Sequence, residues 1–349
     1  MATGLAQRLL DWFQRHGRHD LPWQNPQTPY RVWVSEIMLQ QTQVATVLGY
    51  FERFMRRFPD VQTLAQAPSD EVMQYWAGLG YYARARNMHA AARRIVDEHG
   101  GELPDNAESL RALPGIGEST AGAILSLAFG RPAAILDGNC KRVYARYFGE
   151  PGWPGETRIA RRLWAYARQH TPADRPGDFA QAIMDLGATL CTRKKPDCRR
   201  CPLNADCRAL AEDAVECYPY PRPKKQRPLR QARLLAVMDD DRVLLEKRPP
   251  SGIWGSLWSL PEIGEGFTAE DHARQMLGLQ LEDARPLESF THGFTHFELQ
   301  ITPWIGRKGQ SAGVADEGQL RWYSLARLPG VPAPVAKFLA NLPTRNESS

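Results

Sequence analysis

The sequence predicts a chain of two parts, an all-α region followed by an α+β domain. Apolar residues recur with helical spacing, broken by short Gly or Pro interruptions, through roughly the first 215 residues. A proline-rich basic stretch at 218–228 then prevents both helix and sheet from continuing. Beyond it the apolar spacing becomes that of strands. These observations predict a region at 1–217, a connector at 218–231 and a second domain at 232–343.

The expected helices of the first part follow one another closely. The longest apolar stripe, through 30–58, is expected to form one helix after a loop at 21–26. Its apolar positions run from Tyr30 to Phe51. Further helices are expected at 5–14, 70–76, 83–98, 107–113, 119–129, 140–147, 156–169 and 178–190.

The second part mixes both kinds of element. Runs typical of strands at 232–238 and 242–247 flank an acidic turn at 239–241. A helical pattern follows at 269–277, and a further strand is expected at 297–305. This order of elements predicts an α+β domain.

Composition places the chain among soluble globular proteins. Hydrophobic residues make up 43% and charged residues 24% of the 349 positions, and the net charge is +5. No apolar run approaches the roughly 20 residues that span a bilayer, and Asp11, Arg15 and Arg18 interrupt the N-terminal stretch. We therefore expect a cytoplasmic protein without a membrane partner. Residues 1–231 carry a charge of +8 and residues 232–349 a charge of −3, so the first part is the better candidate for a polyanionic partner, although a solvated basic surface has the same balance.

The segment Leu113-Pro114-Gly115-Ile116-Gly117 joins two expected helices. Gly115 and Gly117 permit a tight turn that opens directly into the second helix. The first N–H groups of that helix would be open to a phosphate. A dinucleotide-binding turn is disfavoured because no strand precedes it. An ordinary glycine turn between packed helices is the alternative.

Two carboxylates stand out in the first part. Glu36 lies among apolar and amide side chains, where desolvation would raise its pKa and keep it protonated. Asp137, in Leu136-Asp137-Gly138-Asn139, is expected to cap a helix. A shielded acid and an ionised carboxylate are the pair that glycoside hydrolysis uses to stabilise an oxocarbenium-like cation. The alternatives are a solvated Glu36 and an Asp137 that is only a cap.

Four cysteines crowd together with the spacing Cys-x6-Cys-x2-Cys-x5-Cys. In a cytosolic chain such spacing favours metal ligation over disulfides. One compact loop with four thiolates suits a cubane iron–sulfur cluster better than a zinc site built from two short knuckles. The residues are Cys191, Cys198, Cys201 and Cys207, with basic side chains at 193, 194, 195, 199 and 200 between them.

These motifs occur in the same order in the helix-hairpin-helix DNA glycosylases. They are the Glu36 helix with Met38-Leu39-Gln40-Gln41-Thr42, the aromatic turn Gly78-Leu79-Gly80-Tyr81-Tyr82, the hairpin, the Asp137 segment and the cysteine loop. The chain closely resembles the MutY branch, adenine DNA glycosylases that remove adenine mispaired with 8-oxoguanine. The resemblance runs from about residue 5 to residue 340.

The resemblance implies a role for each matching residue of the first part. Glu36 would protonate the departing adenine at N7, and Asp137 would stabilise the sugar cation or capture it transiently. Gln41 and Tyr81 would intercalate near the oxidised guanine. The cysteines would hold a [4Fe-4S] cluster. The adenine pocket would be lined by Trp23, Gln24, where arginine is common in the family, and Gln181.

Ser119 separates two branches of these enzymes. Endonuclease III-like relatives carry at this position a lysine whose amine attacks the sugar and permits strand cleavage. A serine cannot form that adduct, so the resemblance implies a monofunctional glycosylase that leaves an abasic site, with Lys141 forming at most a slow, incidental Schiff base. Contacts to the DNA backbone are expected from Gly115, Gly117, Ser119 and Lys141.

The second part resembles the Nudix-like domain of the same family. After Leu260-Pro261-Glu262 the chain lacks the glutamate-rich box that binds metal for pyrophosphate hydrolysis. The resemblance therefore implies recognition rather than hydrolysis. Phe294, Thr295 and His296 occupy the family's Phe-Ser-His loop, which reads 8-oxoguanine. Threonine keeps the hydroxyl of serine and adds a methyl group.

The expected partner is duplex DNA with adenine opposite 8-oxoguanine or guanine, bound by a monomer. Three alternatives remain open at this stage. The first is an endonuclease III-like glycosylase and lyase for oxidised pyrimidines, which Ser119 opposes. The second is an iron–sulfur DNA-binding protein without catalysis. The third is a Nudix hydrolase with a DNA-binding appendage, which the missing glutamate-rich box opposes.

Overall fold

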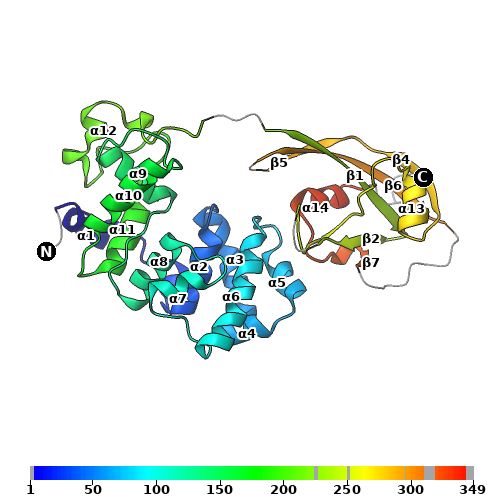
Figure 1. Cartoon of the computed structure of the whole chain (residues 1–349), viewed down its shortest axis with the longest axis horizontal. Coiled ribbons are helices and arrows are strands. Elements are labelled where there is room, and N and C mark those ends of the chain that lie inside the picture. Colours follow the sequence, from blue (N-terminus) through cyan, green and yellow to red (C-terminus); the bar gives the residue numbers. More distant parts are fainter. Residues whose placement is uncertain (1–3, 224–226, 250–251, 295, 310–318, 343–349) are drawn as a thin grey trace. The chain divides into compact units, whose positions relative to one another are not determined.

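A computed structural model describes residues 4–223, 227–249, 252–294, 296–309 and 319–342, and it divides into two compact units (Figure 1). The first unit comprises residues 1–66 and 87–224. The second comprises residues 67–86 and 225–349. Of the described helices, none is long and apolar enough to cross a membrane.

The described residues of the first unit are helical, as the sequence predicts. Most expected helices are present with boundaries shifted by one or two residues, and the short helices α4 and α12 and three 3-10 turns are additions. The elements are α1 (Gly4–His16), η1 (Pro22–Gln24), α2 (Pro29–Leu39), α3 (Val44–Arg57), α4 (Val61–Gln66), α6 (Ala83–His99), α7 (Ala107–Ala112), α8 (Glu118–Phe129), α9 (Gly138–Tyr147), α10 (Thr157–His170), α11 (Pro176–Thr189), η2 (Asn204–Asp206), α12 (Arg208–Ala211) and η3 (Val215–Cys217).

The prediction of a single helix at 30–58 is wrong, because the structure has two helices there, α2 and α3, with a turn between them. Gln41 lies in this turn with φ +58°, a conformation that no helix contains. The Gln40 amide donates to Thr120 Oγ1 of α8 at 3.3 Å. The break contains no Gly or Pro, and a contact with α8 accompanies it, so the local apolar spacing gave no sign of it.

One buried apolar cluster of the first unit lies between α1, α9, α10 and α11. Helix α11 packs on α1, α8 and α9, and α8 also packs on α2. Gly187 allows the close approach of α11 to α9, since a Cβ there would lie 2.6 Å from the Asn139 Cβ. This packing brings the first turn of α9 against the end of α11, beside the cysteine loop.

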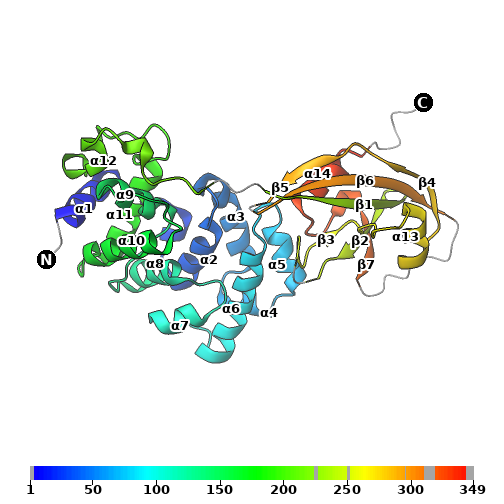
Figure 2. The ribbon, with the colours of Figure 1, turned by 45° about the horizontal axis from the view of Figure 1, so that its top comes forward.

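The second unit contains a mixed seven-stranded sheet with the order β3-β2-β1-β6-β4, in which β5 also pairs with β6 and β7 with β2 (Figure 2). Strands β1 and β6 are parallel, from Leu229 opposite Glu298 to Met238 opposite Arg307. The predicted α+β class is confirmed. The elements are α5 (Ser69–Trp76), β1 (Leu229–Asp239), β2 (Arg242–Lys247), β3 (Trp258–Ser259), α13 (Ala269–Met276), β4 (Leu281–Pro286), β5 (Phe290–Gly293), β6 (Glu298–Lys308), β7 (Leu320–Ser324), η4 (Leu325–Arg327) and α14 (Ala333–Ala340).

Strands β3, β4, β5 and β7 and helix α14 were not expected from the sequence. Strand β3 has two residues, and no residue of β4 or β5 is fully buried, so neither length nor apolar alternation marks them. Strand β1 begins at Leu229, within the stretch expected to be connector. A connector and a strand both have an extended backbone, and only the pairing with β6 shows that these residues form a strand.

Candidate active site

Asp137 lies close enough to Glu36 to influence the charge of the glutamate. Glu36 stands on α2, which Thr28 caps through a hydrogen bond from Arg31 N and which Pro29 begins. Desolvation, and to a smaller extent the negative charge of Asp137, raise the pKa of the half-buried Glu36 to about 8. At neutral pH Glu36 therefore holds a proton that it can donate.

Asp137 is the N-cap of α9, as the sequence predicts. Its Oδ1 accepts a hydrogen bond from Cys140 N at 2.7 Å. The Cys140 thiol also hydrogen-bonds to this carboxylate, and the Asp137 side chain keeps part of its surface exposed. The cap therefore fixes the orientation of a carboxylate that is still partly accessible. Capping and an electrostatic role are compatible here.

Polar side chains hydrogen-bond to the residues on either side of Asp137. Ser119 Oγ accepts from Leu136 N at 2.9 Å, which ties the segment to α8. Arg142 donates to Asn139 Oδ1 at 2.8 Å, Gly187 O at 2.6 Å and Cys191 O at 2.7 Å. One guanidinium thus joins the first turn of α9, the end of α11 and the start of the cysteine loop. Nothing in the sequence pattern distinguished Arg142 from other arginines on these helices.

The hairpin between α7 and α8 contains two glycines with different requirements. Gly115 has φ +81°, and a Cβ there would lie 2.9 Å from the Asn87 Cβ. Gly117 is the N-cap of α8 with φ −90° and open space around it, so its conformation suits any residue. Gly117 has no side chain to cap the first turn of α8, which leaves those N–H groups for an external acceptor. The half-buried Lys141 lies on the first turn of α9.

Gln41 and Tyr81 share an exposed position and an uncommon backbone conformation. Gln41 is exposed with φ +58°, and Tyr81 is 48% exposed with φ +50°. Non-glycine residues adopt this region rarely, and such residues gather at functional sites. The Arg84 guanidinium lies 5.3 Å from the centre of the Tyr81 ring. Each side chain is thus presented outward from its own unit.

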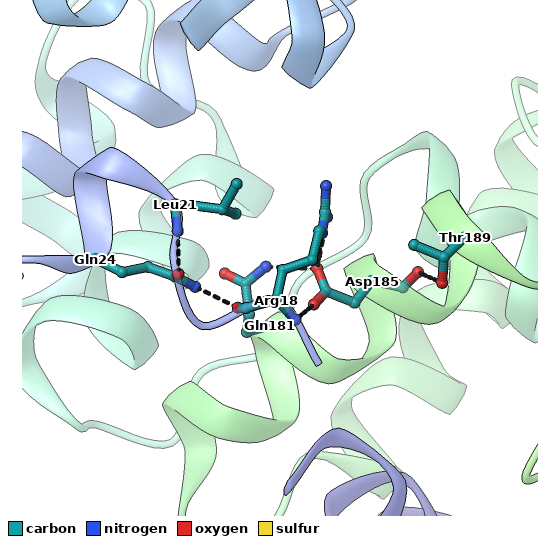
Figure 3. Close-up of polar contacts among 6 residues, drawn as sticks. All are labelled: Arg18, Leu21, Gln24, Gln181, Asp185 and Thr189. Atoms are coloured by element: carbon teal, nitrogen blue, oxygen red, sulfur yellow. Dashed lines mark hydrogen bonds and ion pairs between the residues drawn. The ribbon is translucent and has the colours of Figure 1, made fainter. Parts of the chain in front are cut away.

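The residues assigned to the adenine pocket lie on η1 and α11. Trp23 is 5% exposed, with its ring edge-on to Phe51 at 5.4 Å. Gln24 binds the preceding loop through both polar atoms of its side-chain amide. Its Oε1 accepts from Leu21 N at 3.0 Å, and its Nε2 donates to Arg18 O at 3.0 Å. Figure 3 shows this loop facing Gln181 and Asp185 of α11.

Asp185 connects α11 to the loop that precedes η1. Arg18 donates to Asp185 Oδ1 from Nε at 2.9 Å and Nη2 at 2.5 Å, and Arg18 N donates to Oδ2 at 2.8 Å. Gln181 Nε2 also donates to Oδ1, at 2.7 Å. Asp185 is completely buried. Sequence reasoning missed both Arg18 and Asp185, because a charge among apolar residues of a helix does not reveal its distant partner.

The four cysteines line one cavity together with Leu190, Pro196, Leu210 and Val215. Their thiols are free and partly buried, and burial raises the pKa of Cys201 to about 12. The buried Arg146 donates to Cys191 Sγ at 3.3 Å and to Thr192 O at 2.7 Å. Four thiols along one apolar cavity beside a cationic donor are the ligand type that an iron–sulfur cluster takes. In the described part of the chain, however, no three His, Cys, Asp or Glu side chains are already gathered closely enough to hold one metal ion. Arg146 is a further residue that the sequence did not single out.

The residues assigned to lesion recognition lie around the turn between β5 and β6. Phe294 stacks on Phe297 at 4.5 Å between ring centres and meets His292 edge-on at 4.9 Å. The ring centres of Trp254 and Phe294 are 6.1 Å apart. His296 is exposed, and Thr295 falls outside the described residues. The loop thus rests on an aromatic cluster inside the second unit.

Comparisons with known proteins match two different family models to the chain. A model of the HhH-GPD superfamily of base excision DNA repair proteins matches residues 34–169, and a NUDIX domain model matches residues 233–341. The adenine DNA glycosylase of Buchnera aphidicola subsp. Acyrthosiphon pisum is 37% identical over 339 residues, which cover 96% of this chain and 97% of the relative. The human adenine DNA glycosylase is 35% identical over 380 residues, covering 91% and 68% of the two chains.

Solved structures match the helical part of the chain. A thermostable thymine-DNA glycosylase superposes with a TM-score of 0.54 at 27% identity, covering 60% of this chain and 95% of that protein. A non-covalent complex of endonuclease III with DNA gives a TM-score of 0.51 at 22% identity, with 60% and 94% covered. The second likeness establishes the fold alone.

Proposed function

Because the chain belongs to the family of adenine DNA glycosylases, we propose that this DNA N-glycosylase excises adenine from duplex DNA where adenine is paired with 8-oxoguanine or guanine. Membership in the family rests on identity over nearly the whole chain and on the two domain matches. The observation that carries the proposed chemistry is the desolvated position of Glu36 near Asp137: desolvation first, and the charge of Asp137 second, raise the pKa of Glu36 to about 8.

The proposed reaction breaks the bond between the purine and the sugar. Adenine leaves the base stack so that its glycosidic bond can reach the two carboxyl groups. Glu36 donates its proton to N7 of the departing base, which spares the leaving group a negative charge. Asp137 stabilises the positive charge that develops on the sugar, with its orientation fixed by the cap to Cys140 N. Water then adds to C1′ and leaves an abasic site.

We further propose that the enzyme is monofunctional. The position next to the hairpin carries Ser119, whose hydroxyl accepts from Leu136 N. A hydroxyl in this position cannot form a Schiff base with the sugar. Lys141 supplies an amine nearby on α9 and accounts for at most a slow side reaction.

The cysteine loop is proposed to hold a [4Fe-4S] cluster through Cys191, Cys198, Cys201 and Cys207. Their common position along one apolar cavity supports this assignment. A bound cluster would supply the positive charge that keeps buried thiols ionised. Arg146 and Arg142 bind main-chain oxygens of the loop and connect it to α9.

DNA contacts and lesion recognition are proposed at four places, with a monomer as the binding species. The uncapped first turn of α8, with Gly115, Gly117 and Ser119, is suited to a backbone phosphate, and Lys141 adds a positive charge. Gln41 and Tyr81 would enter the base stack. Phe294, Thr295 and His296 would read 8-oxoguanine.

The proposal is tested by single-turnover excision from duplexes with adenine opposite 8-oxoguanine, guanine or cytosine. We expect the fastest release opposite 8-oxoguanine, slower release opposite guanine and the slowest opposite cytosine. Equal rates for all three would overturn the mispair preference. Release of thymine rather than adenine from a mismatched duplex would overturn the adenine assignment.

A further inference from the structure

The side-chain amide of Gln181 is held in one orientation by a buried carboxylate. Its Nε2 donates to Asp185 Oδ1 at 2.7 Å, and Asp185 has no exposed surface. Because a carboxylate that is paired with a guanidinium only accepts hydrogen bonds, the amide group facing it must be the NH2. The oxygen of Gln181 is therefore turned away from Asp185, as Figure 3 shows.

Arg18 makes this arrangement difficult to reverse. It pairs with Asp185 through Nε, Nη2 and its own backbone N–H, so the carboxylate is fixed on both oxygens. Turning the Gln181 amide over would replace a charge-assisted hydrogen bond by a contact between two acceptor oxygens. An amide without such a partner could rotate and present either a donor or an acceptor.

The oxygen of Gln181 has no hydrogen-bond donor among the described residues, and the side chain keeps 7% of its surface exposed. Gln24 differs, because the oxygen and the nitrogen of its side-chain amide both bind the loop at 18–21. Of the two glutamines assigned to the adenine pocket, Gln181 alone therefore has a fixed oxygen that a ligand can use.

We propose that Asp185, supported by Arg18, is a positioning residue that makes Gln181 Oε1 a hydrogen-bond acceptor and so selects a 6-amino purine over a 6-oxo purine. Adenine presents an amino donor at this position, whereas hypoxanthine presents an acceptor. A fixed acceptor binds the first and repels the second, and discrimination of this kind is strong because a mismatched polar group is left unpaired. The inference rests on the proposed function, in which Gln181 lines the adenine pocket.

The test measures single-turnover excision of adenine and of hypoxanthine, each opposite 8-oxoguanine in the same duplex. Asp185→Asn keeps the size of the side chain but offers an NH2 group, which can donate to Gln181 Oε1 and release the amide from its fixed orientation. We expect the ratio of the adenine rate to the hypoxanthine rate to fall by about 3- to 10-fold, the effect of one neutral hydrogen bond.

A double-mutant cycle separates positioning from a general structural effect. In a Gln181→Met background the amide is absent, so Asp185→Asn should leave the ratio unchanged. The matched control is Thr189→Val, which removes a 2.8 Å hydrogen bond to the backbone oxygen of Asp185 without touching its carboxylate. This control should preserve the ratio. An unchanged ratio in Asp185→Asn, or an equal fall with and without Gln181, would overturn the proposal.

A second measurement needs no folded Asp185 variant. In wild-type protein labelled with 15N-glutamine, the Gln181 side-chain signals are assigned by their loss in Gln181→Met. At least one of its amide protons should exchange with water more slowly than those of exposed glutamines, because it is bonded to a buried carboxylate. Fast exchange of both protons would exclude a fixed amide. This readout is independent of excision, whereas failure of the wild-type protein to release adenine would refute the proposed function itself.

Discussion

Ser119 Oγ accepts a hydrogen bond from Leu136 N at 2.9 Å, one residue before Asp137. This contact joins the first turn of α8 to the segment that leads into α9. Gly122 lies on the same helix, and a Cβ there would be only 2.2 Å from Ala134 O. A hydroxyl and a glycine on α8 therefore set the position of the segment that carries Asp137.

Substitution of Ser119 by lysine should introduce a nucleophilic amine beside Asp137. We expect borohydride to trap little covalent DNA adduct with the wild-type protein and clearly more with Ser119→Lys, because only an amine forms the reducible Schiff base. Lys141→Ala serves as the control for incidental adducts and should remove the residual trapping. Abundant wild-type trapping that disappears in Ser119→Ala would contradict a monofunctional enzyme.

The rate of adenine excision should decrease as pH rises through about 8. The acid form of Glu36 is the proton donor, and desolvation followed by the charge of Asp137 raises its pKa to about 8. Glu36→Gln cannot donate a proton and should lose about 10²- to 10⁴-fold in rate while still binding the duplex. The check is single-turnover kinetics between pH 6 and pH 9. A rate independent of pH in this window, or normal excision by Glu36→Gln, would remove Glu36 from the role of acid.

The same substitution should stabilise the protein at alkaline pH. The folded state raises the pKa of Glu36 above its value in the unfolded chain, so the folded state binds more protons between about pH 4.5 and pH 8. The contribution of this group is therefore present below pH 4.5 and is lost as pH rises towards 8. Glu36→Gln, which stays neutral, should melt at a higher temperature than wild type at pH 8 and show a smaller difference at pH 5. A lower melting temperature at both pH values would contradict this.

Loss of Cys201, one of the four cysteines of the cavity, should lower the iron content and the melting temperature, whereas loss of Cys217 should not. Cys201→Ser removes one of four thiols that line the cavity at 191–207 and should reduce the iron content and the melting temperature. Cys217 is exposed and lies outside that cavity, so Cys217→Ser is the matched control and should change neither. Metal analysis and visible absorbance measure the outcome. Zinc in place of iron would contradict the cluster assignment.

The sequence predicted those features that depend on neighbouring residues. Asp137 as a helix cap and the hairpin between α7 and α8 follow from local patterns, and both occur in the structure. The change in apolar spacing also predicted a helical class followed by an α+β class, and the structure has both. The break between α2 and α3 did not, because its turn is stabilised by a contact from Gln40 to Thr120 of α8.

The long-range polar contacts of the first unit were also impossible to predict from local sequence. Arg18 and Asp185 are 167 residues apart, and the sequence around each one does not indicate its partner. Arg142 contacts Asn139 nearby but also two main-chain oxygens from 187 and 191. Side chains that act directly on a substrate carry recognisable chemistry, whereas those that position them are identified only by their contacts.

The two glycines of the hairpin should differ when each is replaced by alanine. Gly115→Ala forces a Cβ into a backbone conformation with φ +81° and to within 2.9 Å of the Asn87 Cβ, so the hairpin must shift. We expect a loss of about 1–3 kcal/mol in stability and weaker binding to duplex DNA at fixed salt. Gly117→Ala adds its Cβ to open space at φ −90° and should change stability by less than about 1 kcal/mol. Thermal melting and equilibrium binding to one duplex check both variants. Equal effects of the two substitutions would show that the geometry of Gly115 does not shape the DNA-binding turn.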